Sequence, residues 1–355
     1  MACLLPYSSP LPPDTVNEIP AGAIRVIATD LDATLLASSH TVPLATAAYL
    51  RTLHERGVPV VVATGRSIRT ALPLCEALDL ASPTPVFLVC FNGSCAIRLL
   101  PSPHWAAYHE TGALEAVVEL PPLLSRPLDP AVARDVLEIS RDLGCATQYY
   151  VRDGDVLAEC STEAHRDLCR RYRELTGRDQ IFCADGPGDL DRAAAAHDSE
   201  AGTPMKILIM TDDPGGVFAA VRERLPAERA HVISAEFFVE VLMPATDKAD
   251  ALGRVCGALG VEMAEHMAFF GDGNNDVEAL RRCRLGVAMR NGTDAALAAG
   301  DRVTAGSNDE EGVMRFVRGL EECGALAGGE GGGRGGGVVL EKEDGEEVVS
   351  EKSEA

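Results

Sequence analysis

A small set of polar residues carries the groups from which this sequence could build a reactive site. Each follows an apolar run or begins a predicted helix: Asp30, Asp32, Thr64, Lys248, Asp272, Asn275 and Asp276. Several carboxylates in one place repel one another unless a cation neutralises them. Oxygen ligands without Cys or His suit a hard ion such as Mg²⁺, and a hydroxyl and an ammonium group suit a phosphoryl group beside it. These residue types predict phosphoryl transfer.

The apolar runs that precede these residues predict buried strands of a parallel sheet. The runs cover residues 24–29, 58–63, 86–91, 267–270 and 285–289. Apolar residues at helical spacing between residues 44 and 53 predict a strand, helix, strand crossover. Because ligands bind beyond the carboxyl ends of the strands in such sheets, we expect the polar residues to meet in one crevice.

A different pattern interrupts the parallel one from about residue 94 to residue 244. It mixes Pro-rich loops, a helix near residues 131–143 and strands in KILIM and EFFVEVLMP. We therefore predict an α/β fold with a doubly wound parallel-sheet core, formed by residues 22–92 plus 246–322. Residues 93–245 would form an inserted α/β cap domain, with hinges near residues 92–93 and 244–246.

Composition limits the partners and the location of the protein. The chain has 355 residues and a formal net charge of -22, which argues against binding to nucleic acid or to anionic membranes. No apolar stretch approaches the roughly 20 residues of a membrane helix. We expect residues 1–21 to be flexible and the Gly-rich, acidic residues 323–355 to be disordered. The cysteine pattern and the absence of a targeting signal favour the cytoplasm, and no protein partner is indicated.

Each motif alone has a plainer explanation. A pair such as Asp30 and Asp32 after a strand is more often a helix cap or a solvated loop, and a lone Lys248 is usually a surface residue. The turn ATGR, including Arg66, could serve the backbone only. It is the set, in order at successive strand ends, that favours a catalytic site.

The sequence resembles the four motifs of the haloacid dehalogenase (HAD) superfamily of phosphohydrolases at four places. In chain order these are DLDATL, ATGR, the isolated Lys248 and GDGNND. The insertion between the second and third motifs resembles that of the Cof-like branch, which carries a class IIB α/β cap. The segment that begins GVAMRNGTDAALAAG is similar to the closing segment of the same branch. The resemblance covers about residues 22–320 and is loose in the cap.

The resemblance implies a division of labour among the catalytic residues. Asp30 would be the nucleophile that forms an aspartyl phosphate. Asp32 would be the general acid and then the general base, while its backbone carbonyl binds Mg²⁺. Thr64 would hydrogen-bond a phosphoryl oxygen, and Lys248 would stabilise the charge on the transferring group.

The same resemblance implies the remaining metal and substrate contacts. Asp272 would bind Mg²⁺ directly and Asp276 would support it from close by. Asn275 would contact phosphate or orient the acids. Gly65 and Arg66 complete the candidate phosphate-binding or substrate-binding residues. The implied metal-binding set is thus Asp30, Asp32, Asp272 and Asp276.

Three residues depart from the glycines that are usual in the resembled motifs: Ala33, Ala249 and Arg290. If the turn at Ala33 needs a positive φ, its methyl group costs roughly 1 kcal/mol. None of the three removes a reacting group, so we expect a lowered activity and an unchanged mechanism.

The function that fits these observations best is Mg²⁺-dependent hydrolysis of a small phosphorylated metabolite, such as a sugar phosphate or a nucleotide-like cofactor phosphate. Two alternatives stay open: a phosphotransferase or phosphomutase on the same scaffold, and a catalytically weakened binding protein. Four residues of the inserted region are candidates for the substrate pocket: His104, Trp105, His109 and Tyr149.

Overall fold

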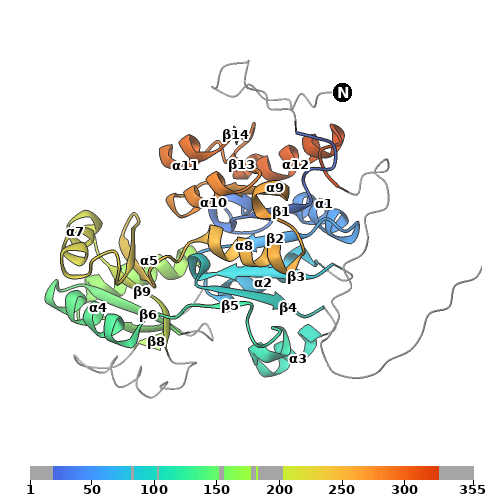
Figure 1. Ribbon diagram of the computed structural model, residues 1–355. Coiled ribbons are helices and arrows are strands. Elements are labelled where there is room, and N and C mark those ends of the chain that lie inside the picture. The colour runs from blue at the N-terminus through green and yellow to red at the C-terminus, as the bar shows by residue number, and fades with distance from the viewer. Residues whose placement is uncertain are drawn as a thin grey trace, which may run out of the picture.

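The computed structural model describes residues 19–80, 84–101, 104–151, 156–176, 181–182 and 203–327. Of the flexible segment expected at residues 1–21 and the disordered tail expected at residues 323–355, residues 1–18 and 328–355 lie outside the described residues. The expected start of the tail was wrong, since Ala325 and Leu326 are buried and the backbone N–H of Ala327 donates to the carbonyl oxygen of Ile24 at 2.8 Å. Within them, two β-sheets with helices on their faces organise the chain (Figure 1). None of the described helices has the length and apolar character needed to cross a bilayer.

The larger sheet holds eight strands in the order β14-β13-β12-β1-β2-β3-β4-β5. The strands from β14 to β3 run parallel to their neighbours, and β4 and β5 are antiparallel. Their bounds are β1 Val26–Thr29, β2 Val60–Ala63, β3 Val86–Cys90, β4 Cys95–Leu99, β5 Leu124–Ser125, β12 Met267–Gly271, β13 Leu285–Ala288 and β14 Arg302–Val303. Both faces of the central strands are buried, as expected for apolar runs in a parallel sheet.

Helices cover the larger sheet on both faces. Alternate residues of a strand point to opposite faces: Ile27 of β1 packs with the first helix layer, and Val26 and Ala28 pack with the second. The first layer contains α1 (Leu44–Glu55), α2 (Ile68–Leu78) and α12 (Gly312–Glu322). The second contains α8 (Lys248–Ala258), α9 (Met263–His266), α10 (Val277–Arg282) and α11 (Asp294–Ala299). This arrangement confirms the predicted doubly wound core.

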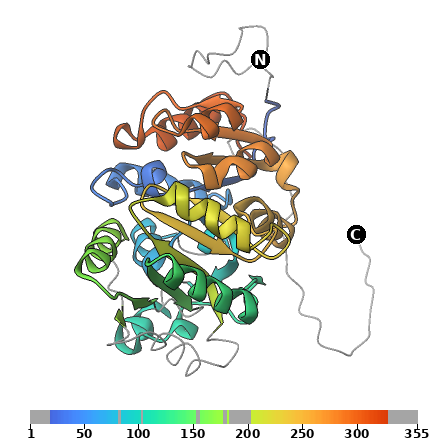
Figure 2. The same ribbon diagram turned by 90° about the vertical axis from the view of Figure 1, so that its left-hand side faces the viewer.

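The smaller sheet has six strands in the order β10-β11-β9-β6-β7-β8. All neighbours are antiparallel except β7 and β8. The strands are β6 Ala146–Val151, β7 Val156–Glu159, β8 Ile181–Phe182, β9 Pro204–Met210, β10 His231–Ser234 and β11 Phe238–Leu242. Figure 2 shows α4 (Pro130–Asp142) and α7 (Pro214–Arg224) side by side over its outer face. The helix α5 (Glu163–Thr176) packs on the face turned toward the larger sheet.

The chain passes between the two sheets at places that the sequence did not fully indicate. Only the turn Phe91–Gly93 and Ser94 separate β3 from β4, so the two strands pair as antiparallel neighbours within the larger sheet. Residues 95–101 and 104–125, including the short helix α3 (Trp105–Thr111), therefore stay with the larger sheet, although they fall in the range predicted for the cap. The outgoing connection follows Ser125, and the return follows Leu242.

The turn Phe91–Gly93 nevertheless lies beside the returning connection. Phe91, Asn92 and Ala245 all have left-handed backbones, with φ values of 52°, 53° and 53°. Gly93 has φ +100°, and a Cβ atom there would lie 2.1 Å from the carbonyl oxygen of Asp247. Only glycine permits this close approach, which holds the strand-end turn against the start of α8.

Candidate active site

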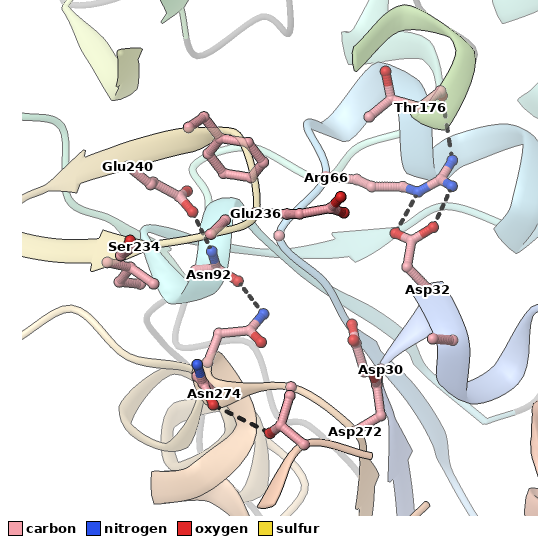
Figure 3. A pocket seen from close by; sticks show the side chains of 18 of the residues that line it. Asp30, Asp32, Arg66, Asn92, Thr176, Ser234, Glu236, Glu240, Asp272 and Asn274 are labelled. Carbon is pink, nitrogen blue, oxygen red and sulfur yellow. Dashed lines mark hydrogen bonds and ion pairs between the residues drawn. The ribbon is translucent and has the colours of Figure 1, made fainter. Parts of the chain in front are cut away.

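The predicted site residues gather at the carboxyl ends of β1, β2 and β12, beside a cavity of about 580 Å³ between the two sheets (Figure 3). Six of them line this cavity: Asp30, Asp32, Gly65, Arg66, Asp272 and Asn275. Thr64, Lys248 and Asp276 are fully buried and are not among its lining residues. Asp30 follows β1, Arg66 lies just beyond β2, and Asp272 follows β12. The parallel order of these strands places their ends side by side. The opposite wall comes from the smaller sheet and α5.

A tight turn, Leu31–Leu35, follows Asp30 and contains the second acid of the first motif, Asp32. Ala33 has φ 53° and ψ 10°, and its carbonyl oxygen accepts a hydrogen bond from Asn291 Nδ2 at 2.7 Å. Asp32 keeps an extended backbone within the turn. The condition for strain at Ala33 is therefore met, because an L-residue is disfavoured in the left-handed region.

The other two departures from glycine need no left-handed backbone. Ala249 lies buried in the first turn of α8. Arg290 donates from its backbone N–H to Thr304 Oγ1 at 3.0 Å, and its exposed side chain forms an ion pair with Glu310. The structure accommodates both residues, so only Ala33 is strained.

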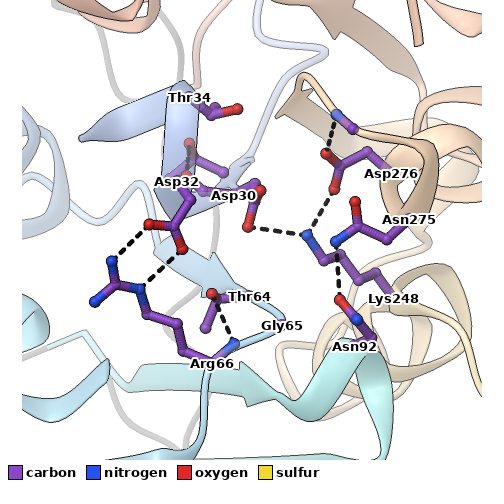
Figure 4. Close-up of polar contacts among 12 residues, drawn as sticks. Asp30, Asp32, Thr34, Thr64, Gly65, Arg66, Asn92, Lys248, Asn275 and Asp276 are labelled. Atoms are coloured by element: carbon purple, nitrogen blue, oxygen red, sulfur yellow. Dashed lines mark hydrogen bonds and ion pairs between the residues drawn. The ribbon is translucent and has the colours of Figure 1, made fainter. Parts of the chain in front are cut away.

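Lys248 lies at the centre of the site as the first residue of α8 (Figure 4). Asp247 caps this helix by accepting from the backbone N–H of Asp250 at 2.7 Å. The Lys248 side chain is fully buried, with Nζ 2.9 Å from Asp30 Oδ1 and 2.7 Å from Asp276 Oδ1. Burial alone would lower the pKa of Lys248, but the two carboxylates outweigh it and raise that pKa. The lysine is therefore held charged.

Three acids gather around this lysine. Carboxylate oxygens of Asp30, Asp272 and Asp276 all lie within 4.8 Å of one another. Asp276 Oδ2 accepts from the backbone N–H groups of Asp272 and Gly273 at 3.0 and 2.9 Å. A Cβ atom on Gly271 would lie 2.5 Å from Asp276 Cγ, so glycine is required there. The fourth motif, GDGNND, thus folds back on itself and fixes Asp276.

The three acids carry more negative charge than Lys248 neutralises. Burial raises the pKa of Asp30 well above its usual value, with Lys248 opposing and the neighbouring aspartates adding to the rise. Burial, then the charge of Asp276, raises the pKa of Asp272 to about 6. Thr34 donates to Asp272 Oδ1 at 2.8 Å and orients that carboxylate. A donor set of oxygens with excess negative charge fits a hard metal ion, and these three acids could hold one.

Asp32 is directed away from this cluster and toward Arg66. Arg66 Nε and Nη2 donate to the two carboxylate oxygens of Asp32 at 2.8 and 2.5 Å (Figure 4). Arg66 Nη1 also donates to the carbonyl oxygen of Thr176 in α5 at 3.3 Å. Two parallel charge-assisted hydrogen bonds fix the plane of the Asp32 carboxylate against that of the Arg66 guanidinium. The Asp32 carboxylate is thus outside the acidic cluster, and Arg66 binds an acid of the site.

The turn after β2 joins the cavity to neighbouring strand ends. Thr64 is buried, and its Oγ1 accepts from the backbone N–H of Arg66 at 3.1 Å. Gly65 lines the cavity, where a Cβ atom would lie 3.0 Å from Asn92 Oδ1. Asn275 Nδ2 donates to the same Oδ1 at 2.9 Å. The three predicted residues Thr64, Gly65 and Asn275 thus meet around Asn92.

The smaller sheet supplies cavity residues that the sequence analysis did not identify. Tyr172 of α5 and Phe238 of β11 provide aromatic surface, and Lys206 of β9 and Glu240 of β11 form a buried ion pair. The available signal was a single charged residue in each of the apolar runs PMKILIM and FVEVL. A charge on a strand buried at most positions needs a partner.

The four pocket candidates named from the inserted region were wrong, since none of them lines the described cavity. Trp105 donates to the carbonyl oxygen of Leu100, and His109 contacts Glu76. Tyr149 packs under α4 on the outer side of the smaller sheet. Strand alternation decides this: the next residue, Tyr150, is on the side of the larger sheet. His104 is exposed.

Comparison with known proteins places this chain among the haloacid dehalogenase-like hydrolases. A family model described as haloacid dehalogenase-like hydrolase matches residues 27–111 and 116–317. The 5-amino-6-(5-phospho-D-ribitylamino)uracil phosphatase YitU of Bacillus subtilis is 26% identical over 293 residues, which are 82% of this chain and 96% of that protein. The Arabidopsis thaliana protein named endoribonuclease YBEY, chloroplastic, is 28% identical over 292 residues. This match covers 81% of the chain but 45% of that longer relative.

Solved structures share the fold. The sugar phosphatase of HAD subclass IIB superposes with a TM-score of 0.64 at 17% identity, covering 85% of this chain and 100% of that one. At this identity the likeness establishes a common fold.

Proposed function

The chain belongs to the haloacid dehalogenase-like hydrolases, and from this premise we propose that it hydrolyses a small phosphate monoester with Mg²⁺ through an aspartyl-phosphate intermediate. The family that the motifs indicated is thereby confirmed, and the chain is a hydrolase of phosphate monoesters. One observation carries the finer proposal. The buried Asp30 lies 2.9 Å from Lys248 within the acidic cluster, while Arg66 holds a second acid, Asp32, apart from it.

Asp30 and Asp32 would share the two steps of the reaction. In the first, a carboxylate oxygen of Asp30 attacks phosphorus, the bond to the leaving oxygen breaks, and Asp32 gives that oxygen a proton. In the second, water attacks the aspartyl phosphate and Asp32 takes a proton from it. The bond between Asp30 and phosphorus then breaks, which releases inorganic phosphate and restores the carboxylate.

The remaining residues would bind and orient the phosphoryl group. Lys248 is positioned to balance the charge that develops beside Asp30. Thr64 Oγ1 already accepts from a backbone N–H, so its own proton can be donated to a phosphoryl oxygen. Asn275 would contact phosphate or orient the acids.

Mg²⁺ would be held by Asp30 and Asp272, with Asp276 in support and the backbone carbonyl of Asp32 as a further ligand. When bound, it supplies charge neutralisation for the phosphoryl oxygens. The excess negative charge of the acidic cluster supports this assignment. Arg66 would keep the Asp32 carboxylate oriented toward the leaving group.

The substrate is proposed to be a small phosphorylated metabolite. A cavity of about 580 Å³ accepts a molecule of that size. Two similar proteins, a phosphatase of a ribitylaminouracil phosphate and a sugar phosphatase, are named for substrates of this kind. Endoribonuclease activity is not proposed, because the chain covers less than half of the Arabidopsis protein that is named for it. A cytoplasmic location also stays a prediction.

A panel of phosphate esters, assayed with Mg²⁺ and with EDTA, tests the proposal. We expect hydrolysis with Mg²⁺ and none with EDTA. Asp30→Asn keeps the shape of the side chain but removes the nucleophile, so turnover should vanish while the circular dichroism spectrum is unchanged. Asp309→Asn, on the surface beside Ser38, is the matched control. Undiminished hydrolysis by Asp30→Asn would refute the mechanism, and an ester product formed with an added acceptor alcohol would indicate a phosphotransferase.

A further inference from the structure

A buried ion pair connects two strands of the smaller sheet, in the cavity wall opposite the strand ends of the larger sheet. Lys206 Nζ lies 3.0 Å from Glu240 Oε1, and the two side chains are 2% and 5% exposed. Burial alone would lower the pKa of Lys206, but Glu240 raises it. A buried pair is often no more stabilising than well-packed apolar residues of similar volume. The role of the Lys206–Glu240 pair is therefore better inferred from its contacts than from its contribution to stability.

Each member of the pair also reaches across to the larger sheet. Lys206 Nζ donates to the carbonyl oxygen of Gly65, in the turn after β2, at 2.9 Å. Glu240 Oε2 accepts from Asn92 Nδ2, in the turn after β3, at 2.8 Å (Figure 3). The pair thus fixes two strand-end turns of the core from the opposite side of the cavity.

Asn92 extends this connection to a third strand end. Its Oδ1 accepts from Asn275 Nδ2, in the turn after β12, at 2.9 Å. Its backbone N–H donates to the carbonyl oxygen of Thr64 at 3.1 Å. The groups that we assign to phosphate binding, Thr64 and Asn275, are therefore both anchored on Asn92, and Asn92 is anchored on Glu240.

We propose that Lys206 and Glu240 are positioning residues for the reaction. They link the position of the smaller sheet over the cavity to the positions of the phosphate-binding turn Thr64–Gly65 and of the Asn275 side chain. The inference rests on the proposed phosphatase function and extends it. Because the contacts go to the phosphate-binding turns, their loss impairs turnover of every ester, whatever its leaving group.

This role differs measurably from two others that the pair could have. A contact with the leaving group would change KM for some esters and leave others unaffected. A purely structural pair would change stability, and any loss of activity would follow the loss of folded protein. The double variant Lys206→Met with Glu240→Gln separates these roles, since it removes both charges and keeps an acceptor for Asn92.

The experiment measures kcat and KM on the ester panel, inhibition by inorganic phosphate with Mg²⁺, and the melting temperature. The variants are Lys206→Met, Glu240→Gln and the double variant. Arg141→Met is the control, because Arg141 of α4 forms an ion pair with Glu159 of β7 at 2.8 Å. That pair makes none of the contacts to the strand-end turns described above.

In Lys206→Met we expect kcat to fall about 10- to 100-fold on every ester, with weaker inhibition by phosphate. The ratios of kcat/KM among esters should not change. In the double variant the melting temperature should return toward that of the wild type, because no buried charge is left unpaired. Its kcat should stay low, because the contact to Gly65 is still missing. Arg141→Met should keep wild-type kcat.

Three results would overturn the inference. The first is recovery of kcat together with melting temperature in the double variant, which would indicate a structural role. The second is wild-type kcat in Lys206→Met, or a loss confined to some esters. The third is a wild-type protein that hydrolyses no ester, which would overturn the proposed function itself and this inference with it.

Discussion

Replacing Ala33 by glycine should stabilise the protein, although it removes a methyl group. Ala33 has φ 53° and ψ 10° and is exposed, so the methyl group contributes little burial. An L-residue in the left-handed region costs about 1–2 kcal/mol relative to glycine. The greater freedom of glycine in the unfolded chain offsets about 0.4–1 kcal/mol of this. The net gain expected for Ala33→Gly is therefore about 0.5–1 kcal/mol.

The matched control makes the same chemical change in a helix. Ala48 is exposed in α1, and Ala48→Gly should destabilise the protein by about 1 kcal/mol. Urea denaturation in EDTA measures the free energy of unfolding of both variants without a contribution from bound metal. The melting temperature should rise by about 1–3 °C for Ala33→Gly and fall by a similar amount for Ala48→Gly.

The sign of the change in the free energy of unfolding shows whether Ala33 is strained. If Ala33→Gly destabilises the protein as much as Ala48→Gly does, the turn after β1 does not hold a strained left-handed residue. The explanation of this departure from the family pattern would then be lost. A stabilised Ala33→Gly with unchanged turnover would show that alanine costs the turn some stability and leaves the reacting groups in place.

Three further predictions concern the charges of the site. The folded-state pKa of Asp272, about 6 against an ordinary 3.8, means that the metal-free folded protein binds its proton more tightly than the unfolded chain does. The free energy of unfolding should fall by up to about 3 kcal/mol as pH rises from about 4 to 7, and Asp272→Asn or added Mg²⁺ should reduce this fall. Lys248→Met removes the ammonium group between two buried carboxylates. It should lower the free energy of unfolding by about 3–5 kcal/mol in EDTA, and by less in Mg²⁺. Equal losses in both solutions would contradict the view that lysine and metal both neutralise these acids. Arg66→Gln frees Asp32 and should lower kcat about 10- to 100-fold with little change in melting temperature. The control is Arg69→Gln, at a half-buried residue that donates to the carbonyl oxygen of Gly112, and it should leave kcat unaltered.

Local sequence determined the strands of the core and the ends that carry the acids. The runs before Asp30, Thr64 and Asp272 are apolar and β-branched or aromatic, and each is buried in a strand of the parallel sheet. Because a parallel sheet aligns the carboxyl ends of its strands, the convergence of these residues followed from the order of the motifs.

The pairing of segments that are distant in the chain could not be predicted from local sequence patterns. The turn Phe91–Gly93 directs β4 back along β3, so the larger sheet gains an antiparallel edge that the interrupted pattern did not indicate. Arg66 could have bound either phosphate or an acid, and the structure directs its guanidinium to Asp32. Asp32, which keeps an extended backbone before the left-handed Ala33, accepts from two nitrogens of that guanidinium.

The sequence by itself determined which groups this protein has for chemistry and at which strand ends they stand, because burial patterns and carboxyl-end positions are local properties of a strand. Only the tertiary structure decided which of these groups touch. The contacts from Lys206 to Gly65 and from Glu240 to Asn92 join residues 141 and 148 positions apart. Such contacts form because the two sheets pack across the cavity, and no local pattern encodes that packing.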